Sequence, residues 1–151
     1  MKYQNILDRL PYKSTFRFVD EITFLDSDKA IGNYTLRPDA FFYEDHFPGH
    51  PVTPGAILTE IMAQIGLVVL GIFLVPADAA TPIFPLLTSA EVSFLKMVLP
   101  GQKVTVVSSK VYFRFDKLKC KVVMQDAEGD IIATGVFAGM IRRLGNDHET
   151  K

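Results

Sequence analysis

The chain contains a single cysteine, Cys120, among its 151 residues, which excludes an intrachain disulfide and fits a reducing compartment. An excess of charge of one sign is also missing, because 16 Lys and Arg oppose 17 Asp and Glu and leave a net charge of -1. Such a chain lacks the electrostatic footprint of a protein that binds nucleic acid or an anionic membrane. We therefore expect neither of these partners.

Hydrophobic runs long enough for a membrane span are absent as well. Residues 65–75 form an apolar run, but a helix needs roughly 20 such residues to cross a bilayer. Extending the run backwards would place Glu60 in the membrane core. Residues 1–10 are too polar for a secretory signal. We expect a cytoplasmic protein in which the apolar run is a buried helix.

The remaining composition is that of a globular domain, with 48% hydrophobic and 22% charged residues and no repeat or linker. We expect one domain over residues 1–151, with a polar tail over about 145–151. Alternating residues around Cys120 predict an inward strand position, so a reactive thiol is the weaker interpretation.

Local patterns predict a short N-terminal helix that Pro11 ends, a β-rich segment over 16–25, a returning strand over 30–36 and a long loop over 38–54. One helix follows over 54–74, with a proline where a missing N–H costs nothing. Four further strands are expected at 86–97, 103–115, 117–126 and 130–142. A helix that is apolar all round must be covered on every side. We therefore predict an α+β fold in which an antiparallel sheet wraps around the helix, the hot-dog architecture.

Residues 46–60 carry the strongest functional signal: His-Phe-Pro-Gly-His-Pro-Val-Thr-Pro-Gly-Ala-Ile-Leu-Thr-Glu. The segment joins His46 in a Pro/Gly-rich loop, the Pro54–Gly55 helix start and Glu60, a lone carboxylate in the apolar helix. The other polar side chains of this helix are Thr59 and Gln64. Because an unpaired buried carboxylate is costly, we expect Glu60 to be used.

These groups suit proton transfer beside a carbonyl. Imidazole is largely neutral at pH 7, so His46 can act as a base, and Glu60 can act as an acid if apolar surroundings raise its pKa. The Gly55 N–H, at the helix N-terminus, can stabilise a developing negative charge. Taken singly, each residue also has a structural explanation: His46 can cap a loop, Glu60 can face water and Gly55 can serve the backbone alone. His50 is a second candidate base, although its place in the loop favours exposure.

The segment resembles the signature of 3-hydroxyacyl-[acyl-carrier-protein] dehydratases of the FabZ type. The resemblance extends to Leu-Pro-Tyr-Lys at 10–13, Phe-Val-Asp-Glu-Ile at 18–22 and the strand sequence over 90–101, and covers about residues 5–142. It implies dehydration of 3-hydroxyacyl thioesters to trans-2-enoyl thioesters, in fatty-acid synthesis or a related polyene or polyketide route. The implied partner is an acyl carrier protein, and neither a metal nor an organic cofactor is expected.

The resemblance also implies roles for individual residues. The family's catalytic histidine and glutamate come from different subunits of a dimer, so His46 of one subunit would meet Glu60 of another in a homodimer or a larger assembly of dimers. Gly55, after Pro54, would bind the thioester carbonyl, and Gln64 would orient Glu60. Glutamate at the acid position argues against the dehydratase-isomerase subfamily, which carries aspartate there.

The chain departs from the family pattern at a few positions, which leaves the acyl substrate and the pathway open. These positions are Tyr12, Thr15, Arg17, His50 and Thr53. Two alternative functions are a hot-dog acyl thioesterase and a non-catalytic subunit of a heteromeric dehydratase. We expect an acyl tunnel lined by Ile57, Phe84, Leu86 and Phe94. For carrier docking we expect a basic patch of Lys96, Arg142 and Arg143.

Overall fold

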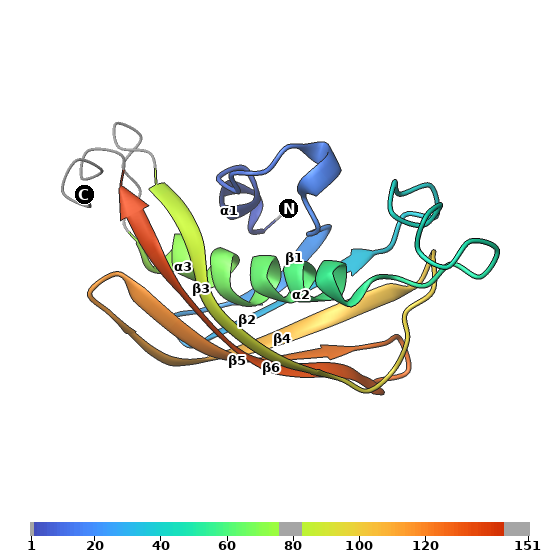
Figure 1. Cartoon of the computed structure of the whole chain (residues 1–151). Coiled ribbons are helices and arrows are strands. Elements are labelled where there is room, and N and C mark those ends of the chain that lie inside the picture. The colour runs from blue at the N-terminus through green and yellow to red at the C-terminus, as the bar shows by residue number, and fades with distance from the viewer. Residues whose placement is uncertain (1, 76–82, 144–151) are drawn as a thin grey trace.

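The computed structural model describes residues 2–75 and 83–143 (Figure 1). Its elements, in chain order, are α1 (Gln4–Leu7), the 3₁₀ helix η1 (Ser14–Phe16), β1 (Glu21–Leu25), β2 (Lys29–Thr35), α2 (Gly55–Ala63), the π-helical segment η2 (Gln64–Val68), α3 (Val69–Leu74), β3 (Ile83–Phe94), β4 (Lys103–Arg114), β5 (Lys117–Gln125) and β6 (Ile131–Arg143).

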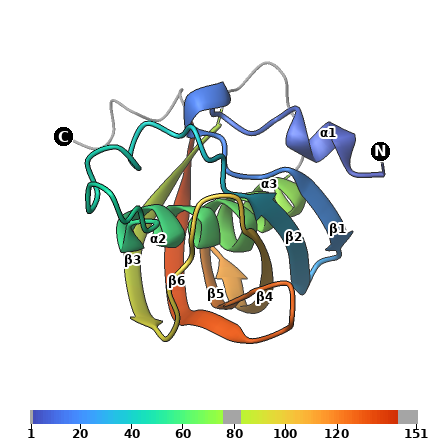
Figure 2. The same ribbon diagram turned by 90° about the vertical axis from the view of Figure 1, so that its right-hand side faces the viewer.

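The strands form one antiparallel sheet in the order β1-β2-β4-β5-β6-β3. The sheet curves around the helix formed by α2, η2 and α3, and the N-terminal segment with α1 lies over the side of the helix that the sheet leaves open (Figures 1 and 2). The predicted α+β architecture, a sheet wrapped around one long helix, is confirmed.

The central helix, Gly55–Leu74, is long and apolar enough to cross a membrane by length and composition, contrary to the expectation that its apolar run is too short. It is nevertheless mostly buried inside the protein. Its second half contributes side chains with no exposed surface, among them Ile65, Val69 and Leu70. This burial is what the sequence predicts for a core helix, because every face of it is apolar.

The helix packs closely against the sheet at Gly66, in the π-helical segment. A Cβ built on Gly66 would lie 2.8 Å from Cγ1 of Val122 on β5. The buried Ser108 hydroxyl on β4 donates a 2.6 Å hydrogen bond to the Gly66 carbonyl. A π-helical turn redirects backbone groups away from the regular helical ladder. Here the irregular turn is therefore fixed to the sheet by one contact that needs glycine and one polar bond.

Strand β3 differs from the other long strands in its burial. Strands β4 and β5 alternate buried and more exposed residues, whereas no residue of β3 is fully buried. The large apolar side chains that β3 exposes are Phe84, Leu86, Leu87 and Phe94. Because β3 is also an edge of the sheet, it presents both apolar side chains and unpaired backbone groups.

Two predicted strands have different bounds in the structure. The strand predicted over 86–97 is β3, which pairs from Ile83 and ends at Phe94, because the N–H groups of Leu95 and Lys96 both turn to the Ile132 carbonyl. The β-rich segment over 16–25 is a strand only from Glu21, since a 3₁₀ turn precedes it. Cys120 is buried, as predicted. The polar tail over 145–151 lies outside the described residues.

Candidate active site

His46 lies in the loop between β2 and α2, where its ring stacks on Phe47 with centroids 4.3 Å apart. Its Nδ1 atom is 2.7 Å from the Val52 carbonyl oxygen. A carbonyl oxygen only accepts hydrogen bonds, so Nδ1 carries the proton in the neutral ring and Nε2 keeps its lone pair. The loop thus selects the tautomer in which Nε2 can accept a proton.

The other loop histidine, His50, is exposed. Its backbone N–H closes a turn onto the Phe47 carbonyl at 2.8 Å, and Phe47 and Gly49 have positive φ values of 63° and 83°. No side-chain hydrogen bond of His50 is formed within the described residues. His50 therefore occupies the exposed position that the sequence favours.

The loop joins the helix through Thr53, whose side chain is buried. Its hydroxyl lies 2.5 Å from the Tyr43 hydroxyl, and its N–H donates to the Val98 carbonyl at 2.8 Å. A larger apolar residue would leave the Tyr43 hydroxyl without this partner. The partner explains the departure from the family pattern at this position.

Gly55 begins α2, after Pro54 as N-cap. Its N–H has no hydrogen-bond partner among the residues that the structure describes, as expected for the first turn of a helix. A Cβ at this position would lie 3.3 Å from the Phe94 ring. Glycine therefore leaves the N–H approachable and lets the aromatic ring pack against the helix start.

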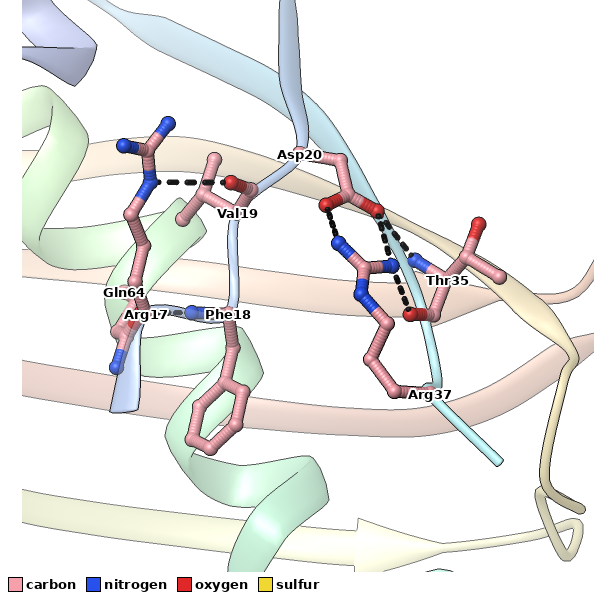
Figure 3. A network of polar contacts seen from close by, with 7 residues as sticks. All are labelled: Arg17, Phe18, Val19, Asp20, Thr35, Arg37 and Gln64. Carbon is pink, nitrogen blue, oxygen red and sulfur yellow. Dashed lines mark hydrogen bonds and ion pairs between the residues drawn. The ribbon is translucent and has the colours of Figure 1, made fainter. Parts of the chain in front are cut away.

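Glu60 is held by Gln64, one turn further along the helix. The Gln64 Nε2 donates to Glu60 Oε2 at 2.9 Å and to the Phe16 carbonyl at 2.8 Å, and the Phe18 N–H donates to Gln64 Oε1 at 2.7 Å. Figure 3 shows the bond between Gln64 and Phe18. Because a backbone N–H must face the amide oxygen, the NH₂ group is forced toward the carboxylate.

Glu60 faces an apolar pocket of about 160 Å³ between the helix and the ends of β3, β5 and β6. Burial raises the pKa of the Glu60 carboxyl above its usual range, and the hydrogen bond from Gln64 opposes this rise. The other lining residues are Tyr12, Ala63, Leu67, Val68, Gly71, Pro85, Leu86, Leu87, Leu118, Gly139, Met140 and Ile141. Burial therefore makes the protonated form, which can donate a proton, more accessible than it is for an exposed glutamate.

The structure brings the predicted site residues together only in part. Gln64 contacts Glu60, but His46 is not among the described residues that line the pocket with Glu60. Of the predicted tunnel residues, Leu86 lines this pocket, Phe94 covers Gly55, Phe84 is exposed on β3 and Ile57 packs against the core. His46 and Glu60 therefore occupy separate places within one chain.

The structure also shows the surroundings of the predicted basic patch and of possible metal ligands. Lys96 bonds to Asp126 at 2.5 Å and to Asp130 at 3.1 Å, so part of its charge is balanced locally. Docking of a carrier protein at Lys96 stays a prediction. Arg143 lies 3.8 Å from Asp116. Over residues 2–75 and 83–143, no three His, Cys, Asp or Glu side chains are grouped to hold a metal ion.

Tyr12 is the site residue that the sequence analysis missed. It lines the Glu60 pocket, and its pKa is raised to about 12, first by burial and then by the charge of Glu60. The signal that could have found it is the departure itself, since tyrosine stands where the family usually has histidine. The phenol therefore stays neutral beside the carboxyl.

A family model described as a FabA-like domain matches residues 10–137. A 3-hydroxyacyl-[acyl-carrier-protein] dehydratase FabZ of Syntrophobacter fumaroxidans is 30% identical over 140 residues, which cover 89% of this chain and 93% of the relative. The corresponding FabZ of Rhodospirillum rubrum is 31% identical over 138 residues, covering 90% and 84%.

Among solved structures, the dehydratase heterocomplex ApeI:P from Xenorhabdus doucetiae superposes with a TM-score of 0.78 at 15% identity and covers 95% of both chains. A thioesterase superfamily member from Thermus thermophilus gives a TM-score of 0.62 at 20% identity, covering 80% of this chain and 85% of that one. At these identities the superpositions show the shared hot-dog fold. With the family match and the FabZ relatives, the chain belongs to the FabA-like family, as a FabZ-type hot-dog dehydratase.

Proposed function

We propose that the protein removes water from 3-hydroxyacyl thioesters carried by an acyl carrier protein, giving trans-2-enoyl thioesters. The FabZ relatives support this reaction over most of the chain. The observation that carries the proposal is the Glu60–Gln64 pair, because Gln64 orients the carboxyl in an apolar pocket whose burial raises the carboxyl's pKa. The single, buried cysteine supports a reducing, cytoplasmic setting.

Each step of the elimination has a group of this chain assigned to it. The free Nε2 of His46 takes the proton from the carbon next to the thioester carbonyl. The N–H of Gly55, after Pro54, stabilises the negative charge that develops on the carbonyl oxygen. Glu60 gives its proton to the 3-hydroxyl group, which leaves as water. Gln64 holds the carboxyl in the direction of this transfer.

The proposed site is shared between two protomers. Within one chain His46 lies outside the pocket of Glu60, so a second copy has to supply the base. Strand β3 supports this arrangement, because its exposed edge carries Phe84, Leu86 and Phe94 beside the helix start and the pocket. Pairing of two β3 edges would cover these side chains and join both sheets.

The test is incubation of the purified protein with 3-hydroxyacyl-carrier-protein substrates of several chain lengths, with the products identified by mass spectrometry. A loss of 18 mass units with the thioester intact is expected, since water (about 18 Da) is the only group that leaves. Release of free acid instead would identify a thioesterase. No reaction of the chain alone, with activity on adding a second hot-dog protein, would identify an accessory subunit.

A further inference from the structure

Tyr12 lies between two hollows of different character. One is the apolar pocket of Glu60. The other is an open, polar cleft of about 350 Å³, lined by Tyr12, Ser14, Arg17, Val19, Asp20 and Arg37. Tyr12 is the residue common to both linings, so it lies where the two hollows meet.

The side chain of Tyr12 is held in this position by the same network that orients the acid. Its ring packs on Phe16 with centroids 6.0 Å apart. The Phe16 carbonyl accepts a 2.8 Å hydrogen bond from Gln64, and Gln64 donates to Glu60 as well. Tyr12 and Glu60 thus line the same pocket, and Phe16 and Gln64 link them through a ring contact and two hydrogen bonds.

The charged groups on the two sides of Tyr12 differ sharply. In the apolar pocket, Tyr12 is the one titratable side chain beside Glu60 among the described lining residues, which come from α2, η2, α3, β3, β5 and β6. In the polar cleft, Asp20 is paired with Arg37 at 2.5 Å. Figure 3 shows this pair and Arg17, whose Nε makes a long 3.4 Å bond to the Val19 carbonyl.

Removal of the Tyr12 ring would change the surroundings of the Glu60 carboxyl in two ways. If the ring separates the two hollows, its removal would let water from the cleft reach the carboxyl and would bring the cleft-lining Arg17 cation closer to it. Both changes favour the ionised carboxylate. An ionised Glu60 cannot donate a proton to the leaving hydroxyl.

We propose that Tyr12 is a positioning residue whose ring separates the Glu60 carboxyl from the polar cleft and from the Arg17 cation that lines it. This role rests on the proposed function of Glu60 as the general acid. In the shared site, His46 of the other protomer is the further titratable group that faces Glu60. The separation depends on the ring, and its effect on Glu60 is independent of the phenolic hydroxyl.

The test measures Glu60 directly, by NMR of the ¹³C-labelled glutamate side-chain carboxyl in the full chain, with Glu60→Gln assigning its signal. Tyr12→Ala is expected to lower the pKa of Glu60 and to reduce kcat by about tenfold, less than loss of the whole acid. Tyr12→Phe, which keeps the ring, is expected to keep the Glu60 titration. Adding Arg17→Leu to Tyr12→Ala is expected to move the titration part of the way back.

Tyr112→Ala is the matched control, because this tyrosine lies on β4 outside both hollows. The proposed role of the Tyr12 ring is disproved if the Glu60 titration is unchanged in Tyr12→Ala. It is also disproved if the titration shifts equally in Tyr12→Phe. If Tyr12→Ala fails to fold, Tyr12→Ser, which also removes the ring, replaces it under the same criteria. A wild-type protein without dehydratase activity would overturn the proposed function, while the NMR titration still decides whether Tyr12 shields Glu60.

Discussion

The loop that carries His46 and the helix face that carries Glu60 are held in place in contrasting ways. His46 is oriented by a carbonyl six residues further along its own loop. Glu60 is oriented by Gln64, which is bonded to backbone groups 46 and 48 residues earlier in the chain. His46 is thus placed by local chain geometry, whereas Glu60 is placed by tertiary structure. Disturbance of the core should therefore affect the acid first.

The largest effect is expected from removing either group. His46→Ala and Glu60→Gln should each lower kcat/KM by roughly 10²–10⁴-fold, since a positioned acid or base contributes about that much. Steady-state kinetics with a 3-hydroxyacyl-carrier-protein substrate measures the loss, and circular dichroism checks the fold. His50→Ala is the control and should be far milder. A severe His50 variant beside an active His46 variant would reassign the base.

The next effect concerns the sharing of the site. Mixing equal amounts of the His46→Ala and Glu60→Gln proteins under subunit exchange should restore about one quarter of wild-type activity, because half the dimers are mixed and each holds one intact site. Activity after mixing is compared with that of each variant alone. A wild-type protein that light scattering shows to be an active monomer would disprove the shared site.

A smaller effect, on stability, is expected from the acid's anchor. Gln64→Leu strands the Phe18 N–H and the Phe16 carbonyl, so the free energy of unfolding should fall by about 2–4 kcal/mol. Urea unfolding measures it. Thr59→Ala, one residue before Glu60, should change stability by less than about 0.5 kcal/mol. An equal fall in the free energy of unfolding in the two variants would mean that the contacts of Gln64 do not stabilise the helix face that carries Glu60.

The smallest effect is a pH-dependent shift in melting temperature. The pKa of Glu60 is raised by burial, so its ionisation as pH rises opposes folding, and this penalty is absent below its ordinary pKa. Glu60→Gln cannot ionise there and should gain a few degrees over wild type between pH 4 and pH 8. Glu128→Gln, in an exposed turn, is the matched control. A constant difference across this pH range would contradict the raised pKa.

The sequence predicts the elements that depend on local or periodic signals. The helix over 54–74 is found at Gly55–Leu74, and the strands β4, β5 and β6 lie within about one residue of their predicted bounds. The apolar period and the Pro-Gly signals suffice for these because they act within a few residues. The family was also identified from a local signal, the motif over residues 46–60.

The sequence does not predict features that depend on distant partners. The π-helical segment depends on the contact of Gly66 with Val122 and on its bond from Ser108, more than forty residues away. The ion pairs of Lys96 with Asp126 and Asp130 in the β5–β6 turn likewise join residues about thirty positions apart. The roles of His46, Gly55 and Glu60 stay predictions until the variants are measured.

Gln64 also bears on which substitutions this fold can tolerate over time. Its bonds to the N-terminal segment are to the backbone of Phe16 and Phe18, and every residue except proline offers both an N–H and a carbonyl. The side chains at 15 and 17 are therefore free to vary while the acid's anchor remains. This freedom accounts for Thr15 and Arg17 in a member of the family, and it makes the segment a place where a dehydratase can acquire new surface chemistry without losing its catalytic geometry.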